Sequence, residues 1–522
     1  MKLSLFSLLA CLPAAFAAFG VTTSGNNLLV DSGAGLVTTI NKANGDITSL
    51  NFNGKQLQDS SKFTQLSSGL GSATVTSSVA NNIAVITIKT STITHYYIVR
   101  SGSNTIYIGT FASAEPSVGE LRFIARLSKS ALPNGHPNAE INGGTAIEGS
   151  DVFLVNGQTR SKFYSSVPFI RDQVHGVTGS GVGVFMIIPS VSYETSSGGP
   201  FFRDINNQGG AQQELYWYMN SGHEQTELPY RTGFFGPYAM AVTTGSAPSA
   251  SLDTSFMDNL GLQGYTTASG RGTVSGSYSG TISGPAVTIG FKVRNSAAQY
   301  WVAGSGGSFS RTLMKPGTYT ATLYQGELEA GTGSVTVRAG ATTSLTLTSN
   351  LSRPSVIWSI GTVDGTPTGF LNADKIQTMH PSDSRMSNWG PITFTVGSSS
   401  VGSFPMAQFK GVNNPTTIRW SASSSQIGAR TLRIRTTEAF AGGRPQITVN
   451  SFTSSAPAAP PNVDSRGVTR GTWRGINQVY DYAIPSGTLV AGTNTITINT
   501  ISGSSGDGFL SPNFVYDSVE LF

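Results

Sequence analysis

Short runs of alternating apolar and polar residues, separated by Gly, Ser and Asn, fill the first half of the chain. Clear examples cover residues 83–88, 105–111, 151–155 and 182–188. Alternation with a period of two predicts strands that bury one face, and many such strands predict a large β-sandwich. The exception is residues 251–260, which predict a short helix at the end of this first domain because Ser251 or Asp253 could cap it.

Two further groups of strands follow. From about residue 264 the runs at 287–293, 318–324, 334–337 and 344–347 predict a small immunoglobulin-like sandwich. After Pro354 the pattern predicts a jelly roll, with a strand at 495–501 and four of the six tryptophans. Carbohydrate-binding modules show this pattern, and buried core tryptophans would produce it equally. The predicted all-β chain divides into a signal peptide at 1–17 and domains at 18–262, 263–350 and 351–522.

The first 17 residues have the composition of a secretory signal peptide. Lys2 precedes an apolar run at 3–12, and Ala15-Phe-Ala17 is a small-residue cleavage site. The chain is therefore expected to be secreted and extracellular. Its only cysteine, Cys11, lies within the signal, so large apolar cores rather than disulfides must stabilise the mature protein. No later apolar stretch reaches the roughly 18 residues that span a bilayer, so no membrane association is expected.

Composition narrows the class of partner. The chain has 62 glycines and only 11% charged residues, which is typical of a secreted all-β protein. Without Lys2, 31 basic residues face 27 acidic ones, a small excess that favours an acidic partner. The basic residues are dispersed, which argues against nucleic acid. One glycosylation sequon begins at Asn350, and a monomer is expected.

The stretch LYWYMNSGH at 215–223 joins three consecutive aromatics to one of five histidines. On a strand, Tyr216 and Tyr218 would share one face and Trp217 the other. Aromatic faces stack on sugar rings, and histidine can move protons near neutral pH. Taken alone, the stretch fits better with a core strand followed by a hydrogen-bonded turn histidine.

After other catalytic groups are excluded, the remaining candidate residues are arginines and a lysine. The mature chain has no thiol, no Gly-x-Ser-x-Gly in a strand-turn-helix setting, no nucleotide fingerprint and no histidine pair at metal-ligand spacing. Arg122 and Arg126, and then Arg160 and Lys162, would each share a strand face. Such pairs suit a carboxylated sugar, although solvated surface charge explains them equally well.

A uronic acid can be cleaved by β-elimination, which needs its carboxylate neutralised, a base for the C5 proton and an acid for the leaving oxygen at C4. Lysine acts as a base only when its amine is neutral, and a nearby cation such as Arg160 favours that form.

Five longer segments carry a resemblance to known proteins. They are AEPSVGELRFIAR (114–126), TAIEGSDVFL (145–154), SKFYSS (161–166), LYWYMNSGH (215–223) and HPSDSRM (380–386). With them the chain resembles secreted fungal rhamnogalacturonan lyases of polysaccharide lyase family 4, from Ala18 to Phe522. The resemblance implies a galactose-mutarotase-like super-sandwich, a fibronectin type III-like sandwich, and a jelly roll similar to carbohydrate-binding modules.

The resemblance also implies an activity. It is endo-cleavage, by β-elimination, of the α-1,4 bond between rhamnose and galacturonic acid in rhamnogalacturonan I, the acidic pectin backbone, leaving an unsaturated galacturonosyl end. The family's catalytic pair falls on Lys162 and His223, which we assign as base at C5 and acid at the leaving oxygen. The family's substrate arginines fall on Arg122 and Arg126, and its aromatic wall falls on Tyr216 and Tyr218. No cofactor is expected in catalysis, and the dispersed carboxylates do not predict a structural calcium ion.

Three other readings stay open at this stage. A pectin hydrolase would need two carboxylates flanking the bond, and Glu148, Asp151, Glu224 and Glu227 are available without forming a recognisable pair. A mutarotase or epimerase could use a histidine with Glu224. The last two domains alone could support a non-catalytic pectin-binding protein.

Overall fold

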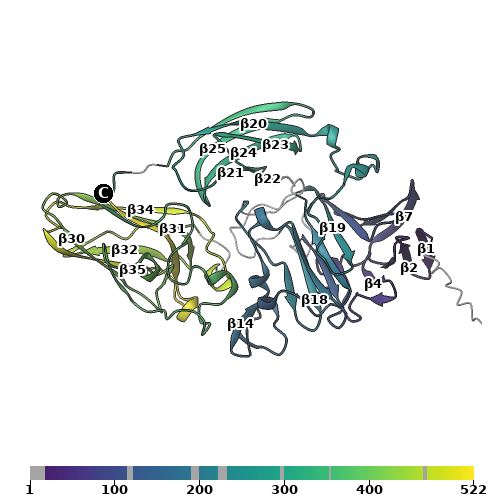
Figure 1. Cartoon of the computed structure of the whole chain (residues 1–522), viewed down its shortest axis with the longest axis horizontal. Coiled ribbons are helices and arrows are strands. Elements are labelled where there is room, and N and C mark those ends of the chain that lie inside the picture. The colour runs from purple at the N-terminus through teal and green to yellow at the C-terminus, as the bar shows by residue number, and fades with distance from the viewer. Residues whose placement is uncertain are drawn as a thin grey trace, which may run out of the picture.

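Strands dominate the structure at every level (Figure 1). The computed structural model describes residues 18–114, 121–189, 199–220, 232–293, 299–351, 354–461 and 467–522. Within these ranges the only helices are 3₁₀ segments of three to five residues, so the all-β prediction is confirmed. They are η1 (Pro137–Ala139), η2 (Lys162–Ser165), η3 (Phe169–Arg171), η4 (Ser255–Asn259), η5 (Ala268–Gly270), η6 (Ile376–Thr378), η7 (Val401–Ser403), η8 (Gly467–Arg470) and η9 (Gly508–Leu510).

Four sheets form the first part of the chain. The largest has seven strands in the order β15 (Val174–Gly179), β16 (Val182–Ile187), β19 (Gly233–Thr243), β10 (Thr105–Ala112), β9 (Ile93–Arg100), β8 (Ile83–Lys89) and β7 (Thr74–Ala80). A four-stranded sheet has the order β17 (Asn207–Gly209), β18 (Gln213–Asn220), β11 (Leu121–Leu127) and β6 (Gln65–Leu66). A five-stranded sheet has its strands in chain order: β1 (Gly20–Ser24), β2 (Asn27–Asp31), β3 (Leu36–Asn41), β4 (Ile47–Phe52) and β5 (Lys55–Gln56). A three-stranded sheet, also in chain order, contains β12 (Thr145–Glu148), β13 (Val152–Val155) and β14 (Gln158–Ser161).

The four-stranded sheet packs one face against the seven-stranded sheet. The ring of Phe123 on β11 lies 6.4 Å from Tyr97 on β9 and 5.9 Å from Tyr238 on β19, measured between ring centres. Trp217 on β18 lies 6.1 Å from the same Tyr238. Alternating inward residues of two facing sheets form the core of a β-sandwich. The strands predicted at 83–88, 105–111, 151–155 and 182–188 are confirmed as β8, β10, β13 and β16.

The predicted helix at 251–260 is present but shorter. It is the 3₁₀ segment η4, which buries Met257. Asp253, one of the two predicted caps, accepts a hydrogen bond from the main-chain nitrogen of Ser255 (3.1 Å). The N-cap residue Thr254 makes no side-chain cap hydrogen bond, and a helix of one turn gains too few hydrogen bonds to offset its nucleation cost.

A two-sheet sandwich follows, as predicted. One sheet has the order β23 (Ser308–Met314), β20 (Gly272–Ser279) and β26 (Thr342–Thr348). The other has the order β22 (Gln299–Ala303), β21 (Val287–Lys292), β24 (Gly317–Gln325) and β25 (Leu328–Val337). Their inward residues, which include Phe291, Tyr300 and Tyr319, form a core separate from that of the first part.

The last part of the chain also has two sheets around one core. The first contains β27 (Trp358–Gly361), β36 (Asn513–Leu521), β31 (Arg430–Phe440) and β34 (Gln478–Ile484), and β29 (Ala407–Phe409) pairs with β36. The second has the order β28 (Thr393–Thr395), β30 (Thr416–Ala422), β35 (Gly492–Ile501), β32 (Arg444–Val449) and β33 (Phe452–Thr453). The predicted strand at 495–501 lies within β35.

The four tryptophans of this last part are core residues. Trp358 and Trp420 are buried with ring centres 6.3 Å apart. Trp389 and Trp473 are partly buried against the same core. The indole nitrogens of Trp389 and Trp473 donate to the Pro381 carbonyl and the Glu327 carboxylate (2.9 and 3.2 Å). These four tryptophans are therefore better described as core residues than as a sugar-binding platform.

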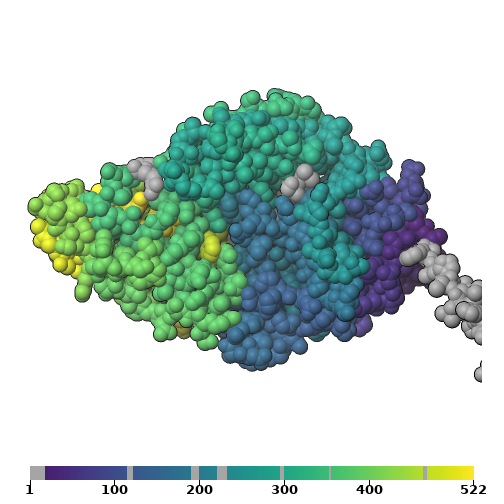
Figure 2. All heavy atoms as spheres, viewed as in Figure 1, coloured from purple at the N-terminus to yellow at the C-terminus, as the bar shows by residue number. Residues whose placement is uncertain are grey.

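The three groups of strands are packed against one another. The predicted divisions at residues 262 and 350 fall between the groups. In the space-filling view the blue segment of the first group lies directly against the green and yellow last group (Figure 2). Hydrogen bonds cross this boundary, from Thr159 to Asp383 (2.6 Å) and from Tyr164 to the Thr469 carbonyl (2.9 Å).

A buried histidine in the first core predicts sensitivity to acid. His95 is 1% exposed, with its Nδ1 2.8 Å from Thr110 Oγ1. Burial lowers the pKa of His95 from 6.5 to about 3. As the pH falls from about 6.5 towards 3, the unfolded chain therefore binds a proton that the folded protein does not. Each pH unit in this window should cost the native protein about 1.4 kcal/mol of unfolding free energy.

The test compares the native chain with His95→Phe by urea unfolding at pH 7 and pH 4.5. The variant removes the titrating group and keeps an aromatic ring beside Tyr97, whose ring centre lies 4.7 Å from that of His95. We expect the variant to lose clearly less stability between the two pH values. Equal losses in both proteins would show that His95 does not govern this acid response.

Candidate active site

Two arginines lie on the face of β11 that points away from the seven-stranded sheet. Arg122 and Arg126 are four residues apart on one strand, as predicted, and pair in register with Tyr218 and Glu214 of β18. Arg122 Nη1 donates to the Tyr218 hydroxyl (3.3 Å), and its Nη2 donates to Ser68 Oγ (3.4 Å). Arg126 Nε lies 3.4 Å from Glu214 Oε1. The two arginines therefore lie on one surface made by two neighbouring strands, about 13 Å apart along the backbone of β11 with Ile124 between them.

Tyr216 and Tyr218 form a stacked pair beside these arginines. Their rings lie 5.8 Å apart at an interplanar angle of 11°, and the Arg122 guanidinium lies 5.9 Å from both ring centres. The tyrosines are 6% and 4% exposed, so they are more enclosed than an open wall for sugar rings. The Tyr216 hydroxyl donates to the Glu214 carboxylate. Burial, with the nearby Glu214 charge, raises the pKa of Tyr216 well above its usual range, so this phenol stays neutral at working pH.

Trp217 points to the opposite face, as strand alternation predicts. It belongs to the core shared with the seven-stranded sheet and is 3% exposed. The strand thus serves two purposes, because one face anchors it in the sandwich and the other places two tyrosines beside Arg122.

Lys162 lies at the start of η2, directly after β14. The Ser161 hydroxyl caps this 3₁₀ segment by accepting from the main-chain nitrogen of Phe163 (3.3 Å). The Lys162 amine lies 5.5 Å from the centre of the Phe163 ring, and Phe163 packs in one buried cluster with Tyr216 and Tyr218. Lys162 is therefore joined to the tyrosine pair through its neighbour.

The same-face relation of Arg160 and Lys162 stays a prediction. Strand β14 ends at Ser161, whose backbone is still extended, and Lys162 is the first residue of η2. Arg160 donates to the Gln158 side chain (2.7 Å) and to the Thr159 carbonyl (3.2 Å).

Asp151 and Arg470 are the charged residues beside Lys162. Asp151 Oδ1 lies 3.8 Å from the Lys162 amine, and its Oδ2 lies 2.9 Å from Arg470 Nη2. Sequence reasoning named Asp151 only as a carboxylate for a hydrolase and did not single out Arg470. No local signal could have found Arg470, because it comes from the last part of the chain and reaches this site only in the folded protein.

The described histidines have structural contacts. His175 places its ring nitrogens 2.9 Å from Asp172 Oδ1 and 2.9 Å from the Tyr216 carbonyl oxygen, so it fixes the backbone of β18. His380 Nε2 lies 3.1 Å from the buried Glu148 carboxylate. His136 caps η1. His223, the predicted acid, and Glu224 and Glu227 lie outside the described residues.

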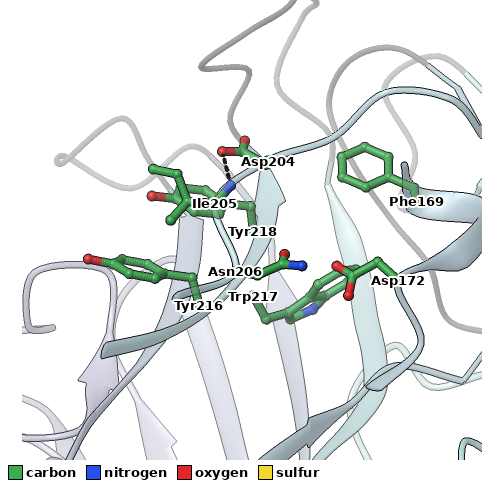
Figure 3. A pocket seen from close by; sticks show the side chains of 8 residues that line it. All are labelled: Phe169, Asp172, Asp204, Ile205, Asn206, Tyr216, Trp217 and Tyr218. Atoms are coloured by element: carbon green, nitrogen blue, oxygen red, sulfur yellow. Dashed lines mark hydrogen bonds between the residues drawn. The ribbon is translucent and has the colours of Figure 1, made fainter. Parts of the chain in front are cut away.

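A pocket opens at the tyrosine strand (Figure 3). The Asp172 carboxylate lies beside the Trp217 indole, and Asp204 accepts from the main-chain nitrogen of Ile205 (2.8 Å). The space of about 180 Å³ in this pocket includes open solvent. The part of this pocket that is enclosed is about the size of one water molecule, so the pocket alone does not hold a sugar chain. The remaining lining residues are Phe169, Asn206, Tyr216 and Tyr218.

In the described part of the chain, no group of three His, Cys, Asp or Glu residues could hold a metal ion. No helix among the described residues is long and apolar enough to cross a membrane. Asn350 is exposed, whereas Ser352 of its sequon lies outside the described residues.

Comparisons with known proteins cover nearly the whole chain. A family profile described as "Rhamnogalacturonan lyase B, N-terminal" matches residues 19–264. Two others, described as domain II and domain III of polysaccharide lyase family 4, match residues 270–345 and 356–521.

Three fungal relatives are similar at high identity over their full lengths. "Rhamnogalacturonate lyase A" of Aspergillus aculeatus is 54% identical, with 100% of both chains covered. "Probable rhamnogalacturonate lyase A" of Aspergillus clavatus is 55% identical over 97% of both chains. "Rhamnogalacturonate lyase A" of Emericella nidulans is 53% identical over 97% of this chain and 96% of its own.

Proposed function

The chain belongs to polysaccharide lyase family 4, and from this membership we propose that it cleaves the rhamnogalacturonan I backbone of pectin by β-elimination. The observation that carries the proposal is the identity of 53–55% to three rhamnogalacturonate lyases along their whole length. The protein is thus a polysaccharide lyase. The finer parts of the proposal are endo-action at the rhamnose-α-1,4-galacturonic acid bond and an unsaturated galacturonosyl product.

The proposed reaction divides among four basic residues. Arg122 and Arg126 neutralise the galacturonate carboxylate, which stabilises the charge that develops when the C5 proton leaves. The neutral amine of Lys162 takes that proton. The electron pair of the C5–H bond forms the C4–C5 double bond while the C4–O bond breaks. His223 gives a proton to the leaving rhamnosyl oxygen.

The described geometry supports this division in part. Arg122 and Arg126 lie on one strand face, and Lys162 lies on a segment that packs against the same tyrosines that Arg122 contacts. Guanidinium groups bind carboxylates through two parallel hydrogen bonds, which suits recognition of a uronate. Because arginine supplies the neutralising charge, we propose that the reaction needs no metal cofactor.

Hydrolysis is less consistent with the described carboxylates. Glu148 is 3% exposed and bound to His380, and Asp151 pairs with Lys162 and Arg470. An inverting or retaining hydrolase needs two carboxyl groups that both face the scissile bond.

One assay tests the proposal. The protein is incubated with rhamnogalacturonan I, with and without a chelator, and the ultraviolet absorbance of the C4–C5 double bond is followed while fragment size is measured. We expect the absorbance to rise at the same rate in both samples and the polymer to shorten rapidly. Fragments without the chromophore would favour hydrolysis, no cleavage would favour simple binding, and a rate lost with the chelator would contradict the metal-free reaction.

Secretion and a monomeric state complete the proposal. The predicted signal at residues 1–17 lies outside the described residues, and an extracellular location follows from the plant-wall substrate. Asn350 is exposed and is the proposed glycosylation site.

A further inference from the structure

Contacts from the last part of the chain converge on the segment that carries Lys162. Arg470 ends η8 and binds Asp151 at 2.9 Å, and the other Asp151 oxygen faces the Lys162 amine at 3.8 Å. The Arg470 guanidinium also lies 4.8 Å from the centre of the Phe163 ring, next to Lys162 in sequence. Lys162, Asp151 and Arg470 therefore form a row of alternating charge across the boundary between the first and last parts.

Two further contacts connect η2 to the last part of the chain. The Tyr164 hydroxyl donates to the Thr469 carbonyl (2.9 Å), one residue before Arg470. Arg203, 2% exposed, donates from one nitrogen to the carbonyls of both Phe163 (3.1 Å) and Gln377 (3.0 Å). A buried arginine that bridges two main-chain carbonyls holds both in fixed positions, because leaving either group unpaired would be costly.

The strand that leads into η2 is held in the same way. Asp383 Oδ2 accepts from both the main-chain nitrogen and the hydroxyl of Thr159 (2.7 and 2.6 Å). Bonds to a charged acceptor are among the stronger hydrogen bonds in proteins. The start of β14 and the η2 segment are thus both fixed by the jelly-roll part.

We propose that Arg470 is a positioning residue for the base, and that the jelly-roll domain completes the active site by supplying it. The inference rests on the proposed role of Lys162. A carboxylate alone beside Lys162 would favour the protonated amine, which cannot act as a base. Arg470 lies closer to Asp151 than Lys162 does, so it offsets that charge while leaving Asp151 to orient the amine.

Other charges near this segment are engaged elsewhere. Glu148 of β12 faces His380 and Thr469 (3.1 and 3.3 Å). Arg160 of β14 faces Gln158. Among the described residues, Asp151 and Arg470 are therefore the charges whose removal should act most directly on Lys162.

The test is a double-mutant cycle in the full-length protein that removes the two charges singly and together. The measured quantity is kcat on rhamnogalacturonan I as a function of pH. Arg470→Gln should move the rise in activity to higher pH by about one unit, and Asp151→Asn should move it to lower pH by a similar amount. The double variant should fall between them, and Arg470→Lys should largely restore the native profile. Arg433→Gln is the matched control, because Arg433 forms an ion pair with Asp481 inside the same domain (2.7 Å).

The opposite signs separate this role from simple stabilisation of the interface. A structural contact would change thermal stability and kcat in one direction for both variants, without moving the pH at which activity rises. Unshifted profiles in both single variants, with Lys162→Met inactive, would overturn the inference and leave the proposed function intact. Full activity of Lys162→Met would instead overturn the proposed function.

Discussion

Replacing Lys162 by methionine is expected to lower kcat on rhamnogalacturonan I by about 10²- to 10⁴-fold, the usual contribution of a positioned general base. Methionine keeps an apolar stem against Phe163 and removes only the amine, which lies 5.5 Å from that ring. Lys162→Ala should show a similar loss. Substrate binding should persist in both variants, because the proposed carboxylate contacts belong to Arg122 and Arg126.

The measurement combines initial rates of double-bond formation with affinity electrophoresis in gels containing the polymer. Lys89→Ala is the control, since Lys89 is exposed at the end of β8. It should keep native kinetics. A Lys162→Met variant that turns over near the native rate would remove Lys162 from the mechanism.

The second large effect is expected at Arg122. Arg122→Ala should lower kcat/KM by about 10²- to 10³-fold, as removal of one donor to a developing negative charge does in other enzymes. Arg122→Lys should recover only part of this, because an ammonium group cannot reproduce the two parallel hydrogen bonds of a guanidinium. The loss should appear in both KM and kcat, since the carboxylate is bound before the reaction and gains charge density during it.

Arg100→Ala provides a matched control for Arg122. Arg100 also lies on a strand of the first domain, over an aromatic ring (4.7 Å from Phe256) and near a polar partner, Asp253 (3.0 Å). Its removal should leave kcat/KM unchanged. Native kinetics in Arg122→Ala would mean that the substrate carboxylate binds elsewhere on the protein.

The two faces of β18 were predictable from sequence because a sandwich strand has only two faces. Once Tyr216, Trp217 and Tyr218 are placed on a strand, alternation requires Trp217 to oppose the two tyrosines. The same reasoning correctly placed Arg122 and Arg126 on one face of β11. Periodicity does not report depth, so the near-complete burial of the stacked tyrosines was not foreseen.

The surroundings of Lys162 were not predictable in the same way. Strand spacing suggested Arg160 as the nearby cation, whereas Arg160 donates to Gln158 and to the Thr159 carbonyl. The residues that do surround Lys162, Asp151 and Arg470, are brought together by packing between domains. Such contacts depend on the tertiary fold and produce no periodic pattern of residues in a single sequence.

The bridge made by Arg203 also limits how this protein can be recombined in evolution or in engineering. A module that is joined to a catalytic domain only by a flexible linker can be exchanged without altering that domain. Here Arg203 joins the carbonyl next to Lys162 to the carbonyl of Gln377. A foreign module in place of residues 351–522 would remove the Gln377 carbonyl, one of the two acceptors that this arginine nitrogen joins. The first and last domains are therefore expected to be inherited as a pair, and exchange of modules should be confined to proteins that preserve this contact.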